Sequence, residues 1–128
     1  MILITGGAFQ GKTAYLRSFR PDIIITDGAD CSFNEAASAA CITHYHALIE
    51  RLISGGIDPV AWTSDLCKRN RGCVVILNEI GSGIIPIEKN ERIRRELTGI
   101  CGCILASHAD SVIRLTCGIP AAIKGDLL

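Results

Sequence analysis

The chain has 128 residues, of which 48% are hydrophobic and 20% are charged. This length suits one compact domain, and the composition is that of a folded protein rather than a disordered one. The 13 basic residues balance the 13 acidic ones, so no net charge attracts nucleic acid or an anionic membrane surface. No apolar run reaches the roughly 18 residues that span a bilayer. The strand-like start lacks a basic leader, so we expect a cytoplasmic protein.

The patterns of strands and helices alternate along the chain. Short, continuously apolar runs of the kind found in strands covered on both faces predict strands at 2–5, 23–26, 73–77 and 111–115. A helix is expected at 12–19. The capping-box pattern from Ser32 to Glu35 predicts a second helix that runs to about Ile53. Asp58-Pro59 predicts a third helix, ending near Arg71-Gly72. A fourth is expected at 88–107, with an apolar stripe of Ile93, Leu97, Ile100 and Ile104.

A phosphate-loop motif stands between the first strand and the first helix. The residues Gly6, Gly7, Ala8, Phe9, Gln10, Gly11, Lys12 and Thr13 fit G-x-x-x-x-G-K-[ST]. The glycines let backbone amides point at an anion, and the helix adds its free N-terminal amides. Lys12 is expected to reach the β- and γ-phosphates, and Thr13 to bind Mg²⁺. These features predict an α/β fold, a three-layer P-loop NTPase-like domain with a mostly parallel sheet, over residues 1–128. The expected ligand is ATP or GTP.

Three acidic residues follow predicted strands, where open α/β sheets bind their ligands. Asp27 and Asp30 follow the second strand and are candidates to hold Mg²⁺. Glu79 follows the third strand and is a candidate to orient or deprotonate an acceptor hydroxyl. The alternative interpretation of each is a residue of a turn or a helix cap, and Asp30 in particular precedes a helix start.

Two histidines, His44 and His46, fall within the predicted helix of residues 32–53. Side chains two residues apart on a helix point about 200° away from each other. We therefore expect His44 on the apolar stripe and His46 on the solvated side, without a shared metal. Either is a candidate to accept a nucleotidyl group covalently. Arg92, Arg94 and Arg95 form either a phosphate clamp or a solvated face neutralised by nearby glutamates.

Further motifs carry a family resemblance. They are Asn78-Glu-Ile-Gly-Ser-Gly-Ile-Ile-Pro86, Ala109-Asp110-Ser-Val112 and Cys117-Gly-Ile-Pro120 with Lys124. With the phosphate loop, they resemble the adenosylcobinamide kinase/adenosylcobinamide-phosphate guanylyltransferase family of cobalamin biosynthesis. The resemblance implies a cytosolic oligomer with a nucleotide-binding parallel sheet. It implies phosphorylation of the aminopropanol hydroxyl of adenosylcobinamide, then transfer of GMP from GTP through a guanylylated histidine.

The resemblance also implies roles for single residues. Gly6, Gly11, Lys12 and Thr13 would bind the nucleotide phosphates, and Asp30-Cys31 matches an Asp-Cys that follows a strand in the family. This chain is shorter than full-length members. It lacks the segment that carries their guanylylated histidine, whereas its own His44 and His46 come after Asp30.

The resulting hypothesis is a cobinamide kinase with possible guanylyltransferase activity. A corrinoid needs a broad cleft, which a domain of this size can build only against a neighbouring subunit, so we expect a homo-oligomer. The alternatives are a nucleotide-binding regulatory subunit without catalysis and a kinase of another small hydroxylated metabolite.

Overall fold

The computed structural model describes residues 1–9, 11–79 and 88–128. Strands and helices alternate over most of this length, as the sequence predicts. The strands are β1 (Ile2–Gly6), β2 (Ile25–Asp27), β3 (Cys41–Thr43), β4 (Val74–Asn78), β5 (Ser111–Thr116) and β6 (Ile119–Lys124). The helices are α1 (Lys12–Phe19), α2 (Phe33–Ala37), α3 (Tyr45–Ser54), α4 (Pro59–Arg69) and α5 (Lys89–His108).

The strands form one six-stranded sheet in the order β2-β3-β4-β1-β5-β6. All neighbouring strands are parallel except β5 and β6, which form an antiparallel hairpin. Gly6 at the end of β1 is in register with Asn78 on one side and Leu115 on the other. The carboxyl ends of the central strands therefore meet at one edge of the sheet, the edge at which α/β folds bind ligands.

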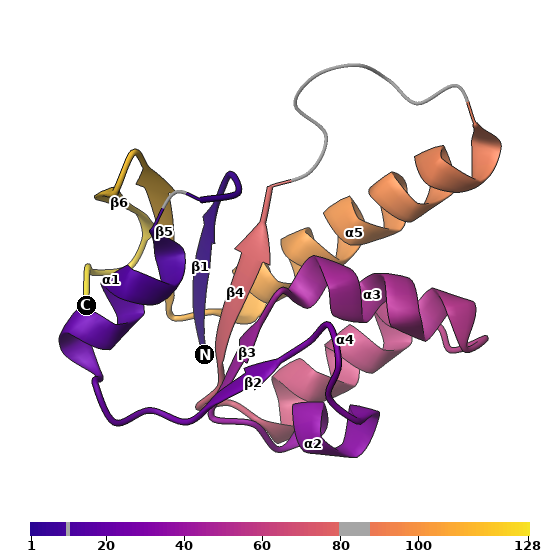
Figure 1. The fold of residues 1–128 in the computed structure, drawn as a ribbon, viewed down its shortest axis with the longest axis horizontal. Helices are drawn as coiled ribbons and strands as arrows, with labels where there is room; N and C mark the ends of the chain where they lie inside the picture. The colour runs from indigo at the N-terminus through magenta and orange to yellow at the C-terminus, as the bar shows by residue number, and fades with distance from the viewer. Residues whose placement is uncertain (10, 80–87) are drawn as a thin grey trace.

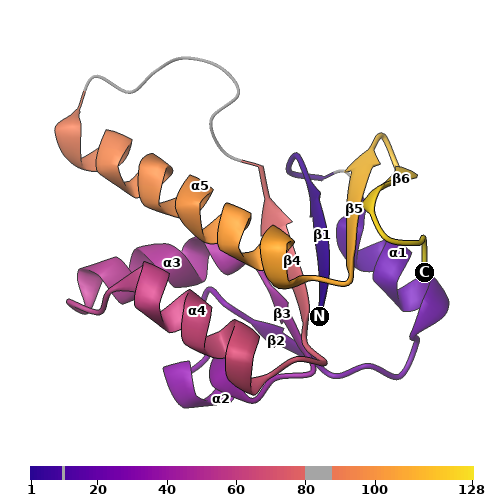
Figure 2. The same cartoon turned by 180° about the vertical axis from the view of Figure 1, so that it is seen from behind.

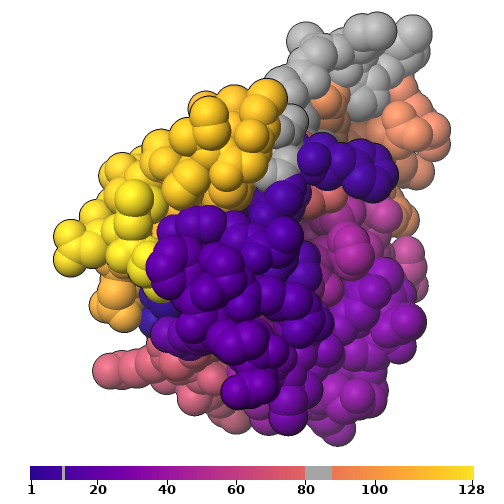
Figure 3. Space-filling view, turned by 60° about the vertical axis from the view of Figure 1, so that its left-hand side comes forward, coloured from indigo at the N-terminus to yellow at the C-terminus, as the bar shows by residue number. Residues whose placement is uncertain are grey.

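Helices cover the two faces of the sheet unequally. Figures 1 and 2 show α1 on one side and α3, α4 and α5 on the other. Under α1, Leu16 packs on Ile4, Ile76 and Ile113, which are at most 3% exposed. The residues that alternate with these in the strands build the second core under the other helices. In the space-filling view of Figure 3 the C-terminal segment lies beside α1, and Leu128 packs against the α1 core. This α/β architecture of three layers is a P-loop NTPase-like fold, as predicted.

Two predicted helix starts are confirmed. The amide of Glu35 donates to the Ser32 hydroxyl at 3.0 Å, and the Glu35 carboxylate accepts from the Ser32 amide in return. The Asp58 carboxylate accepts from the amide of Val60 at 2.9 Å. Such caps satisfy amides that a helix leaves free at its first turn. In the described part of the chain, no helix is long and apolar enough to cross a membrane.

The predicted helix from Ser32 to Ile53 is wrong. Helix α2 ends at Ala37, and the three buried residues of β3 then add a strand between β2 and β4. His44 follows with left-handed backbone angles (φ 50°, ψ 46°), and α3 begins at Tyr45. The apolar spacing of this segment fits a helix as well as a buried strand, so pairing within the sheet decides its structure.

Two further expectations are corrected near the C-terminus. The predicted strands did not include β6, which pairs with β5 as an edge strand. Helix α5 matches its predicted bounds to within one residue, and its buried residues are Thr98, Cys101 and Leu105. Of the predicted stripe, Ile104 packs against that core and is partly buried. Ile93 and Ile100 of that stripe are each 41% exposed. The glycine-rich segment from Gly81 to Pro86 lies outside the described residues.

Candidate functional site

The turn from β1 into α1 contains residues with left-handed backbone angles. Gly11 is left-handed (φ 83°) directly before the first residue of α1, and Phe9 also has a positive φ of 60°. Lys12 begins the helix with its side chain buried, and its Nζ donates to the Gly7 carbonyl at 2.6 Å. Burial lowers the pKa of Lys12, while the Glu79 carboxylate opposes this shift. The predicted loop residue Gln10 lies outside the described residues.

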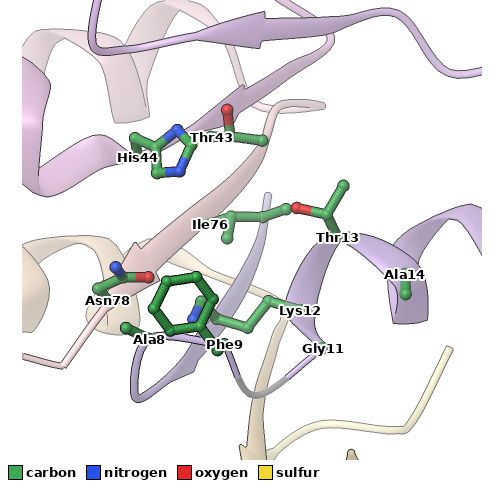
Figure 4. A pocket seen from close by; sticks show the side chains of 10 residues that line it. All are labelled: Ala8, Phe9, Gly11, Lys12, Thr13, Ala14, Thr43, His44, Ile76 and Asn78. Atoms are coloured by element: carbon green, nitrogen blue, oxygen red, sulfur yellow. The ribbon is translucent and has the colours of Figure 1, made fainter.

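A cavity of about 290 Å³ opens beside this loop at the carboxyl edge of the sheet. Lys12 and Thr13 come from α1, while Thr43, His44 and Asn78 come from the ends of β3 and β4 (Figure 4). The remaining lining residues are Ala8, Phe9, Gly11, Ala14 and Ile76. The volume is at the small end for a ligand pocket and suits a polyphosphate tail.

The alternation of side chains along the strands explains which residues meet here. Ile76 packs in the core under α1, so Asn78, two residues later on β4, points to the same face of the sheet. Cys41 also belongs to that core, which places Thr43 on the same face at the end of β3. The sequence reasoning did not single out Thr43 or Asn78. The position of Asn78 at the end of a predicted strand, directly before Glu79, could have indicated a role at the site. Thr43 could not be identified in this way, because it fell within a predicted helix.

His44 is held at the cavity by Asp27. Its Nδ1 lies 2.9 Å from Oδ1 of Asp27, the last residue of β2. The same oxygen accepts the amide of Ala29 at 2.9 Å. The Ala29 amide, together with His44, holds the pKa of Asp27 below its ordinary value, although partial burial opposes them. Asp27 is therefore ionised at neutral pH and accepts the proton on Nδ1.

The sequence expectation for the two histidines is corrected. The His44 side chain is 54% exposed rather than part of an apolar stripe, because the residue precedes α3 instead of lying within a helix. His46, expected on the solvated side, is partly buried, and its Nδ1 is buried without a hydrogen bond. This burial lowers the pKa of His46. The two rings contact edge to face with centroids 5.9 Å apart, and only His44 of the two lines the cavity.

Glu79 is engaged by a partner that sequence reasoning missed. Arg114 of β5 binds it through Nε at 2.8 Å and Nη2 at 3.0 Å, one nitrogen to each carboxylate oxygen. The backbone amide of Glu79 also donates to the Gly6 carbonyl at 2.8 Å. Glu79 is not among the described residues that line the cavity. Its contacts thus tie β4 to β1 and β5 beside the loop.

The described residues fit a magnesium site only in part. Thr13, the residue that the motif predicts to bind Mg²⁺, lines the cavity. Oδ1 of Asp27 is taken by His44 and Ala29, and Asp30 lies exposed in the turn after β2, away from the lining residues. Neither residue 10 nor residues 80–87 include an aspartate or glutamate. Within the described ranges no three side chains of the metal-binding types form a cluster. A site here would rest on Thr13, substrate phosphates and water.

Comparison with known proteins adds evidence from the other half of the chain. Residues 59–123 match the family model described as cobinamide kinase/cobinamide phosphate guanyltransferase. The matched segment runs from the start of α4 into β6 and leaves out the turn between β1 and α1. None of the curated proteins compared with the chain matches it. Because the model covers half of the sequence, the chain belongs to the cobinamide kinase/cobinamide phosphate guanyltransferase family.

Proposed function

We propose that this protein transfers the γ-phosphoryl group of a nucleoside triphosphate to a hydroxyl group of adenosylcobinamide. Membership of the family supports the substrate class and the reaction class. The observation that carries the proposal is the buried Lys12, aligned by the loop at the first turn of α1 and opening onto the cavity. This residue lies outside the segment that the family model matches, so the two lines of support are independent.

Each part of the loop has a task in this reaction. Free amides at the start of α1 bind the phosphate oxygens, since the first turn of a helix leaves such donors unpaired. Lys12 Nζ leaves the Gly7 carbonyl and pairs with the β- and γ-phosphates, where it stabilises the charge that builds up during transfer. The buried ammonium has few contacts with water to lose, so its interaction with phosphate is strengthened.

Magnesium would be held through the hydroxyl of Thr13 together with phosphate oxygens and water. The ion would neutralise charge on the β- and γ-phosphates. We assign Asp27 to His44 rather than to the metal because its Oδ1 accepts from His44 and the Ala29 amide, and because Asp27 is not among the described residues that line the cavity. Asp30 is not part of this assignment, because it lies outside the cavity.

The proposal is tested by incubating the protein with Mg²⁺, cobinamide and either ATP or GTP, and detecting the phosphorylated corrinoid by mass spectrometry. We expect Lys12→Ala to lower turnover about 10²-fold or more. Its thermal stability should not fall, because burial of the ammonium is unfavourable. The matched control is Lys68→Ala, which removes an exposed lysine of α4. Binding of nucleotide without turnover would favour the regulatory subunit, and phosphorylation of other hydroxylated metabolites alone would favour a different kinase.

Guanylyl transfer is the second candidate activity, and the position of His44 favours it. A histidine that accepts GMP must reach the α-phosphate, and His44 lines the same cavity as Lys12 whereas His46 does not. The test uses GTP labelled at the α-phosphate, followed by denaturation in alkaline detergent, because a phosphorus–nitrogen bond to histidine is labile in acid. Label on His44 would support the transferase activity, and absence of label would leave the kinase alone.

We also propose that the protein acts as a homo-oligomer. The cavity of about 290 Å³ holds little more than a polyphosphate, so a corrinoid must lie against surface outside it. A second subunit is the simplest source of the missing wall. Light scattering coupled to size-exclusion chromatography tests this, and a strict monomer that phosphorylates cobinamide at full rate would contradict it.

A further inference from the structure

The hydrogen bond between Asp27 and His44 determines which nitrogen of the ring is free. Asp27 is ionised and can only accept, so Nδ1 of His44 carries the proton and donates it across 2.9 Å. A neutral imidazole with its proton on Nδ1 has its lone pair on Nε2. Within residues 1–9, 11–79 and 88–128, Nε2 has no hydrogen-bond partner. The pair therefore presents an unused proton acceptor at the cavity that Lys12 lines.

The presence of a histidine at position 44 is not explained by its place at the start of α3. It occupies the N-terminal cap of α3, yet its side chain makes no capping hydrogen bond. Its left-handed conformation is uncommon for residues other than glycine and costs of the order of 1 kcal/mol. Asparagine or glycine would fit this turn better, and serine or aspartate would cap the helix better. Unfavourable conformations of this kind gather at functional sites.

We propose that His44 is the base that takes the proton from the acceptor hydroxyl during phosphoryl transfer, and that Asp27 is its positioning residue. This inference rests on the proposed kinase function. In the step, the hydroxyl O–H bond breaks and the proton passes to Nε2 of His44. The hydroxyl oxygen forms a bond to the γ-phosphorus. The bond from that phosphorus to the β-phosphate oxygen breaks, and its electron pair leaves with the nucleoside diphosphate.

The surroundings of the pair suit this role. The half-exposed His44 ring is open to an acceptor that arrives from outside the cavity, while Lys12 and Thr13 approach from α1 (Figure 4). The ring of His46 stands edge to face against that of His44, with the two centroids 5.9 Å apart. Glu79, the other candidate for this role, is bound at both carboxylate oxygens by Arg114. Among the described lining residues, Lys12 is assigned to the phosphates, and His44 is the side chain with an unused basic nitrogen.

The first test compares His44→Asn with the parent protein. Asparagine adopts the left-handed turn readily and can still donate to Asp27, so the variant should fold, but it has no basic nitrogen. We expect the turnover number for cobinamide phosphorylation to fall by about 10²-fold, with the dissociation constant for the triphosphate unchanged. His108→Asn is the matched control, because His108 is exposed at the other end of the fold, two residues before an Asp110 that contacts Met1. Normal turnover by His44→Asn would overturn the proposal.

The second test separates positioning by Asp27 from binding of a metal. Asp27→Asn should lower turnover at least about tenfold, and should add little to the loss already present in His44→Asn, since both changes disable one unit. Asp22→Asn is the control, because Asp22 is an exposed aspartate that precedes β2. A much higher requirement for Mg²⁺ in Asp27→Asn, or losses that simply multiply in the double variant, would overturn the positioning role.

Spectroscopy and labelling complete the test. Nitrogen NMR of the parent should show His44 protonated at Nδ1, and Asp27→Asn should show a mixture of tautomers. A γ-phosphoryl label trapped on His44 would make it a nucleophile and would overturn its role as a base. If the parent phosphorylates no corrinoid, the proposed function fails and the base role fails with it. If the parent is active and His44→Asn equally so, the base role alone fails.

Discussion

Gly28 lies where β2 and the turn into α3 approach most closely, and an alanine there tests the geometry of the Asp27–His44 pair. Its amide donates to the Thr43 carbonyl at 2.8 Å, and its own carbonyl accepts from Arg51 at 2.9 Å. A Cβ atom at Gly28 would stand 2.8 Å from the carbonyl oxygens of both Thr43 and His44. Both neighbours are backbone atoms, so no side chain can move aside, and the end of β2 must shift away from the turn.

The expected size of the effect follows from these contacts. Forcing a methyl group into a closed site costs about 1–3 kcal/mol, and weakening the Gly28–Thr43 hydrogen bond adds about 1 kcal/mol. For a chain of this length each kcal/mol corresponds to about 4 °C, so we expect Gly28→Ala to melt about 8–16 °C lower than the parent. Because the shift also separates Asp27 from His44, the turnover number for phosphorylation should fall more than the affinity for the triphosphate, which depends on Lys12.

Thermal unfolding followed by circular dichroism measures the stability, and calorimetry measures nucleotide affinity on the folded variant at low temperature. Gly72→Ala is the matched control, since a Cβ there meets no atom within 4 Å and its φ is not left-handed. Its melting temperature should equal or slightly exceed that of the parent. If Gly28→Ala melts with the parent, or retains full turnover, the close approach of β2 to this turn is refuted.

Two further predictions concern the buried ammonium group of Lys12 and the buried hydroxyl group of Tyr45. Lys12 has a pKa lowered below 10.5, and bound phosphate should raise it, so affinity for the triphosphate should be constant at lower pH and fall as the pH rises through the lowered pKa. Calorimetry in buffers of different ionisation heat should therefore detect proton uptake on binding that increases as the pH rises toward the lowered pKa, and uptake that does not change with pH would contradict the burial of the ammonium. Tyr45→Phe removes a hydroxyl that lies 2.7 Å from the Thr63 hydroxyl inside the core, so urea unfolding should show a loss of about 1–2 kcal/mol, partly recovered with Thr63→Val. An unchanged or raised stability of Tyr45→Phe would show that this hydrogen bond contributes nothing.

The turn from β1 into α1 and its neighbouring strands were predictable because each depends on local chemistry. Glycines at fixed spacing, a lysine at the helix start and apolar runs in β1 and β4 act over a few residues. The capping groups of Ser32 and Asp58 were predictable for the same reason, because they satisfy amides within their own turn.

The histidine site was not predictable in this way. Strand β3 has three residues, and its identity depends on pairing with β2 and β4 rather than on its own propensity. No glycine or proline marks the end of β3, since His44 itself takes the left-handed position. Because the residues of β3 were predicted to be helical, nothing in the sequence indicated the hydrogen bond between Asp27 and His44. These residues are 17 positions apart and meet because β2 and β3 are neighbours in the sheet.

The buried face of α5 shows a second limit. The pattern of isoleucine and leucine residues identifies a helix, yet Cys101 and Leu105 face the core while Ile93 and Ile100 each remain 41% exposed. Periodicity gives the presence of an apolar stripe, but the rotation of a helix depends on which neighbours it meets. Here those neighbours are α4 and α3 on the same side of the sheet.

The unequal covering of the sheet has a mechanical consequence. In the described chain α1 lies alone on its face, anchored by Leu16, and its first turn also carries Lys12 and Thr13. An anion bound by that turn would stabilise the layer formed by α1, whereas the layer of three helices on the opposite face is stabilised by its own packing. Binding of an anion would thus reduce the mobility of α1, while α3, α4 and α5 on the opposite face would change little.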